Sequence, residues 1–130
     1  MLQRAIKYCS DTIEDDYSPK YVKLQCKELL PILLDKDPKY FMNTNKLKKI
    51  KGLLSIIKMP TGSKTGEPVV TALAGFQIFF LISVLCIYHR DDTTKRRFEN
   101  VLLELPRKSG KTMLVALILL SVYYLSRNIL

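Results

Sequence analysis

The chain has 130 residues, of which 48% are hydrophobic, and this composition indicates a folded domain and excludes an intrinsically disordered chain. The formal net charge of +9 favours an anionic partner such as nucleic acid, a nucleotide or a membrane surface. The alternative is that the charge serves only to keep the protein soluble. A catalytic histidine cluster is excluded because His89 is the single histidine. Cys9, Cys26 and Cys86 show no metal-ligand spacing and are typical of reduced cysteines, so we expect a cytoplasmic protein.

Residues 1–59 are predicted to form a helical segment. Apolar side chains recur at helical spacing over residues 2–14, 22–33 and 47–57. Pro31 is expected to kink or shorten the second helix, and Asn43 belongs to a polar stretch that can cap the third.

Residues 60–68 hold two prolines and two glycines, which break any helix or strand. We interpret this stretch as a linker. It divides the helical segment from a second segment, residues 69–130.

Residues 69–88 carry no charge and are long enough to span a membrane. Gly75 and Gln77 interrupt this stretch, and the later apolar run, residues 113–125, is too short to span. We therefore expect no stable membrane insertion and interpret residues 69–88 as a helix in the core of a larger fold.

The sequence Gly110-Lys111-Thr112 is the second half of a phosphate-binding loop. In such a loop the backbone N–H groups point at phosphate oxygens, the lysine reaches the outer phosphates and the threonine holds Mg²⁺. Leu105 stands where the full motif has a glycine, and a solvated basic turn is the alternative interpretation. The motif predicts ATP and Mg²⁺ as ligands, with Thr112 on the metal.

The loop lies between a strand-like stretch, residues 101–105, and a helix-like stretch, residues 113–125. A near-continuous apolar strand suits the centre of a parallel sheet covered by helices. We therefore predict an α/β fold in which residues 69–130 are the first part of a P-loop NTPase (RecA-like) parallel-sheet domain. That domain would be incomplete in this chain.

Three motifs resemble, in their order and spacing, the start of the large terminase subunit of tailed bacteriophages. They are Gly75-Phe76-Gln77, Arg96-Arg97-Phe98 and the loop at residues 106–112. That family packages viral DNA with an ATPase domain and cuts it with a nuclease domain. The resemblance covers most of the chain. It implies double-stranded DNA, the portal and the small terminase subunit as partners, and the host cell cytoplasm as the location.

The resemblance also implies roles for individual side chains. Gln77 would read the adenine edge, while capping a helix is its alternative role. Terminases commonly have a basic residue inside the loop and no leading glycine, so Arg107 or Lys108 becomes an additional phosphate contact. The implied ATP site consists of Gln77, Arg107, Lys108, Ser109, Gly110, Lys111 and Thr112. Arg96 and Arg97 match a basic pair of the family, and a solvated or ion-paired role is equally open.

The family's acidic pair for Mg²⁺ and water, and its nuclease carboxylates, would lie beyond residue 130. We therefore assign no catalytic residue and expect no ATP turnover by this chain alone. Two other functions fit the sequence. One is a fragment of another P-loop motor such as a helicase, and the other is a small basic membrane-associated protein with residues 69–88 embedded.

Overall fold

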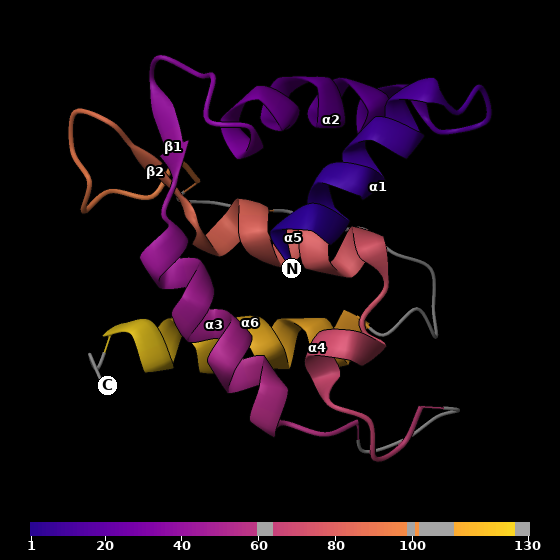
Figure 1. The fold of residues 1–130 in the computed structure, drawn as a ribbon, viewed down its shortest axis with the longest axis vertical. Coiled ribbons are helices and arrows are strands. Elements are labelled where there is room, and N and C mark those ends of the chain that lie inside the picture. Colours follow the sequence, from indigo (N-terminus) through magenta and orange to yellow (C-terminus); the bar gives the residue numbers. More distant parts are fainter. Residues whose placement is uncertain (60–63, 99–100, 102–110, 127–130) are drawn as a thin grey trace.

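The computed structural model describes residues 1–59, 64–98, 101 and 111–126, and it leaves out the side chains of Lys111 and Ser126. These residues form six helices and two short strands (Figure 1). In chain order they are α1 (Leu2–Glu14), α2 (Lys20–Leu33), β1 (Tyr40–Met42), α3 (Thr44–Ile56), α4 (Val69–Ala72), α5 (Gly75–Leu85), β2 (Ile87–His89) and α6 (Lys111–Ser126).

The predicted α/β fold is wrong, because the described residues form a mostly helical domain without a parallel sheet. Strands β1 and β2 pair antiparallel, with Tyr40 opposite His89 and Met42 opposite Ile87. Val101 lies outside any strand, and residues 102–105 are outside the described part of the chain. The physical reason is that the apolar runs fold as helices, which bury their surfaces against one another and need no sheet between them.

The predicted helices of the first segment are confirmed by α1, α2 and α3. Asn43 caps α3, because its side-chain oxygen Oδ1 accepts a hydrogen bond from the backbone N–H of Lys46 at 3.1 Å. Pro31 lies inside α2, which ends two residues later at Leu33. This placement agrees with the expected shortening of the helix.

The apolar stretch at residues 69–88 is divided into α4, α5 and β2 instead of forming one helix. α5 begins at Gly75, where a Cβ atom would lie 3.4 Å from Cβ of Tyr8 on α1. This close approach lets α1 pack directly on the start of α5. In the described part of the chain, no helix has both the length and the apolar character needed to cross a membrane.

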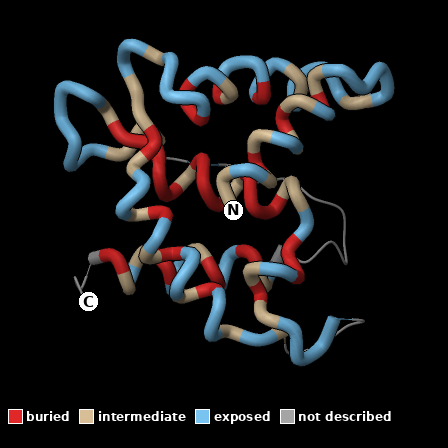
Figure 2. The backbone as a smooth tube through the Cα atoms, viewed as in Figure 1, coloured by how far each residue is buried: buried red, intermediate tan, exposed pale blue. Residues whose placement is uncertain are grey.

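The core is centred on α5, which α1 contacts and α6 also contacts (Figure 1). Buried residues concentrate along α5 and the sides of its neighbours that face it (Figure 2). The guanidinium of Arg4 on α1 donates hydrogen bonds to the carbonyl oxygens of Val70, at 2.7 Å, and of Leu73. Side chains from both sides of residues 60–68 thus share one core. The division into an N-terminal segment, a linker and a nucleotide-binding segment stays a prediction.

Candidate phosphate-binding sites

The predicted phosphate loop lies mostly outside the described residues, and so do its members Arg107, Lys108, Ser109 and Gly110. What the structure describes is the element behind the loop. In the described residues α6 runs from Lys111, the lysine of the motif, to Ser126, and the side chain of Thr112 is exposed. A phosphate loop needs a helix behind its Gly-Lys-Thr sequence, because the first N–H groups of that helix carry a partial positive charge. The presence of α6 agrees with that requirement.

Gln77 is the third residue of α5 and is only 9% exposed. Its side-chain oxygen Oε1 accepts a hydrogen bond from the backbone N–H of Ala74 at 2.8 Å, so it caps the helix. This is the capping role that the sequence left open. The oxygen has a second lone pair and the amide nitrogen has two donors, so the side chain keeps the groups that a base would use.

The starts of α5 and α6 lie on the same side of the molecule. The two helices contact each other, and Figure 1 shows them running in the same direction, with both N-terminal ends on the right. Gln77 and Lys111 are placed near these ends by their positions in the two helices. The structure therefore puts the predicted base contact and the predicted phosphate contact on one side.

Arg97 has the ion-paired role that the sequence left open. Its guanidinium pairs with the carboxylate of Glu28 on α2. The same guanidinium lies over the ring of Tyr40, 4.6 Å from the centroid, and 4.9 Å from the centroid of Phe98. These contacts hold the segment after β2 against α2 and β1, so Arg97 is a structural residue.

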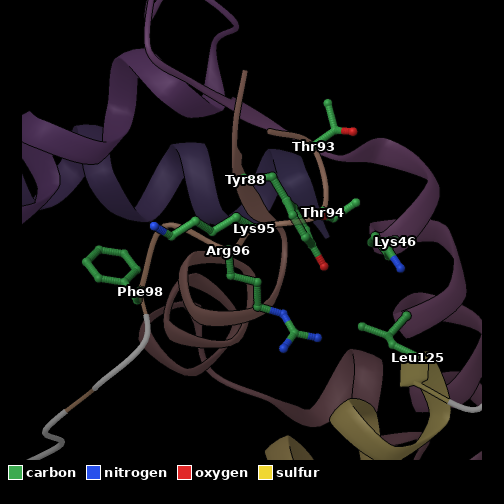
Figure 3. Close-up of a pocket in the computed structure, with 8 residues that line it drawn as sticks. All are labelled: Lys46, Tyr88, Thr93, Thr94, Lys95, Arg96, Phe98 and Leu125. Carbon is green, nitrogen blue, oxygen red and sulfur yellow. The ribbon is translucent and has the colours of Figure 1, made fainter. Parts of the chain in front are cut away.

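Arg96, the other member of the basic pair, lines a groove with a volume of about 650 Å³ (Figure 3). The walls come from the start of α3, from β2, from the segment after β2 and from the end of α6. The lining residues are Lys46, Tyr88, Thr93, Thr94, Lys95, Arg96, Phe98 and Leu125. Sequence reasoning missed this groove because its walls are far apart along the chain. The available sequence signals were the basic pair Arg96-Arg97 and the lysines of residues 46–51, and neither shows that the two groups meet.

Burial shifts the pKa values of the three cysteine thiols. Burial raises the pKa of the Cys86 thiol to about 12, while the nearby positive charges of Arg96 and Lys46 oppose this rise. Burial also raises the pKa of Cys9 and of Cys26. All three thiols are free and buried, so they stay protonated at neutral pH. They have the inert character of core cysteines.

Residues 1–59, 64–98 and 111–126 contain no group of three or more His, Cys, Asp or Glu side chains that could hold a metal ion. The assignment of Mg²⁺ to Thr112 stays a prediction. Comparison of the chain with protein-family models, with curated proteins and with solved structures gives no match.

Proposed function

We propose that the chain binds the phosphates of ATP, together with Mg²⁺, through residues 106–112. The observation that supports this proposal is that the described residues directly behind the Gly-Lys sequence, Lys111–Ser126, form a helix, α6. A phosphate loop requires a helix to begin at its Gly-Lys-Thr sequence, because the free N–H groups of the first turn complete the cradle. A solvated basic turn has no such requirement.

In this proposal each part of the loop has a separate contact. Backbone N–H groups and the cations Arg107 and Lys108 surround the phosphates, Lys111 reaches the outer phosphates, and Thr112 contacts the metal. Gln77, near the same side of the molecule, contacts the adenine. The proposal rests on the loop sequence and the helix behind it, and it does not include the RecA-like sheet.

On the basis of the three sequence motifs, we propose that the chain is the nucleotide-binding N-terminal region of a DNA-packaging motor that resembles the phage large terminase subunit. The support is the ordered set of three motifs and the net charge of +9. Double-stranded DNA, the portal and the small terminase subunit are the partners proposed on the same resemblance.

The test is titration calorimetry of ATP with Mg²⁺ against the wild-type chain and two lysine variants. Lys111→Ala removes one charge-assisted contact to phosphate, which costs about 1.5–3 kcal/mol and weakens binding about tenfold or more. Lys48→Ala removes an exposed lysine of α3 and serves as the matched control. Equal affinity of the wild type and Lys111→Ala would reject the phosphate-loop assignment.

A further inference from the structure

The groove described above is a second cationic site, built from residues that are not part of the phosphate loop sequence. Two of its cations, Lys46 and Arg96, come from α3 and from the segment after β2. Within the described chain neither side chain has an ion pair, although Arg97 next to Arg96 is paired with Glu28. The guanidinium nitrogen Nε of Arg96 is buried and has no hydrogen-bond partner. A buried donor without a partner is costly, and a bound acceptor would remove that cost.

Three of the polar side chains that line the groove face one space. Figure 3 shows the guanidinium of Arg96, the amine of Lys46 and the hydroxyl of Tyr88 turned toward the same region, above Leu125. The effect of both positive charges on Cys86 agrees with this placement, because the two cations lie close to one buried thiol. Two cations and a hydroxyl that face one region form a site for an anion with several oxygen atoms.

The groove also suits more than an inorganic anion. Its volume of about 650 Å³ lies in the range of small-molecule pockets and far exceeds one phosphate group. Its lining includes the aromatic rings of Tyr88 and Phe98 beside the polar groups. An arginine fork matches two oxygens of a phosphate, and a lysine adds a mobile point charge.

We propose that this groove binds a small phosphate monoester, with Arg96 and Lys46 on the phosphate and the aromatic side chains against its organic part. None of the residues that line this site belongs to the loop sequence at residues 106–112, and the proposal does not depend on the function proposed for that loop. A free phosphate ion and a phosphate monoester both carry the dianionic phosphate group that Arg96 and Lys46 would bind. Comparing the affinities of the groove for these two ligands shows which of them it prefers.

The experiment is NMR or calorimetric titration of the whole chain with phenyl phosphate, inorganic phosphate and phenol. We expect phenyl phosphate to bind more tightly than inorganic phosphate, and phenol not to bind. Arg96→Ala is expected to weaken phenyl phosphate binding about tenfold or more, because it removes a charge-assisted bidentate contact. Lys46→Ala is expected to weaken it by about three- to tenfold, since one charge-assisted contact is lost.

Three further variants keep the outcome unambiguous. Arg96→Lys keeps the positive charge but loses the two-pronged guanidinium, so its affinity for phenyl phosphate should lie between those of the wild type and Arg96→Ala. This variant tests the role of Arg96 even if Arg96→Ala does not fold. Lys48→Ala controls for net charge, and Lys111→Ala separates this groove from the phosphate loop. Lys48→Ala should bind phenyl phosphate within about twofold of the wild type, because the charge of this exposed lysine is screened by solvent.

Several results would overturn the proposal. One is no binding of phenyl phosphate by the wild-type chain at millimolar concentrations, and another is equal weakening by Lys48→Ala and Arg96→Ala. Loss of binding only in Lys111→Ala would place the phosphate in the loop instead. Much tighter binding of a single-stranded oligonucleotide, lost in Arg96→Ala, would assign the groove to nucleic acid instead of a small ester.

Discussion

Helices α5 and α6 have similarly apolar sequences, yet the fold buries them to different extents. Seven of the eleven residues of α5 are buried, including the polar Gln77 and Ser83. α6 keeps one buried stripe and exposes the side chains of Val115, Leu119, Leu120 and Tyr123. α5 contacts α1, α6 and β2, whereas α6 contacts α3 and α5. Composition makes both helices apolar, but the number of neighbours decides which faces are buried.

The largest expected effect compares one leucine from each helix. Leu81→Ala removes a side chain that is 0% exposed in the centre of α5, and the cavity should lower the free energy of unfolding by about 2–5 kcal/mol. Leu119→Ala removes a side chain that is 66% exposed on α6, and the change should stay within about 0.5 kcal/mol. Urea denaturation measures both. Similar losses in the two variants would show that α6 is covered as fully as α5.

The C-terminal end of α5 gives a pH test of the same burial. The pKa of the Cys86 thiol is raised from 9.0 to about 12, so the folded state holds this proton more tightly than the unfolded state. Its stabilising contribution is present below pH 9 and is lost as the pH rises toward 12. Between these values the free energy of unfolding should fall by about 1.4 kcal/mol per pH unit on account of this thiol.

The measurement compares the slope of stability against pH for the wild type and Cys86→Ala. The variant loses packing at every pH, so only the difference in slope reports the thiol. Cys9 and Cys26 are present in both proteins and cancel in the comparison. Parallel curves above pH 9 would mean that Cys86 is accessible to solvent.

The starts of the two helices give the next test. Gln77→Ala removes the capping hydrogen bond at the start of α5 and should cost about 0.5–2 kcal/mol of stability. Thr112→Ala acts at the exposed start of α6 and should change stability by less than about 0.5 kcal/mol. Thermal unfolding measures the pair, and Gln77→Glu, which keeps an acceptor, should lose less than Gln77→Ala. Equal losses at the two helix starts would contradict the difference in capping.

Local sequence signals predicted the helices well and the sheet badly. The spacing of apolar residues in α1 and α3, and the cap at Asn43, depend on neighbours a few residues apart, so they could be predicted. Strands β1 and β2 have three residues each, and three helices lie between them in the chain, so no local sequence pattern predicts their pairing. The parallel sheet was predicted from a single apolar stretch, residues 101–105, and the described residues form a mostly helical fold instead.

The candidate sites differ in the same way. The phosphate loop could be proposed from the sequence because its residues are contiguous, and it stays a prediction, with a helix described from Lys111 onward. The groove could not, because Lys46 and Arg96 meet only after α3 and the segment after β2 have packed. The different roles of Arg96 and Arg97 were also hidden, since only the fold places Glu28 beside one of them.

The smallest expected effect concerns two serines that α5 and α6 bury without partners. Among the residues that the structure describes, the hydroxyl oxygens of Ser83 and Ser121 have no hydrogen-bond partner, and Ser121 is 0% exposed. A buried hydroxyl that has lost its water is destabilising, and alanine also has the higher helix propensity. Ser121→Ala and Ser83→Ala should therefore each raise the free energy of unfolding by about 0.5–1 kcal/mol.

A gain in stability in both variants would show that water is excluded from the buried stripe of α6 as fully as from α5. The two helices would then differ only in their solvent-facing sides. The exposed Ser55→Ala on α3, whose hydroxyl donates to the Lys51 carbonyl at 2.7 Å, is the control and should not gain as much. Denaturant titration at neutral pH has the precision to resolve these changes in sign. A loss of stability in Ser121→Ala alone would mean that an ordered water or another group reaches the inner stripe of α6, and the contrast between the two helices would then extend into the core.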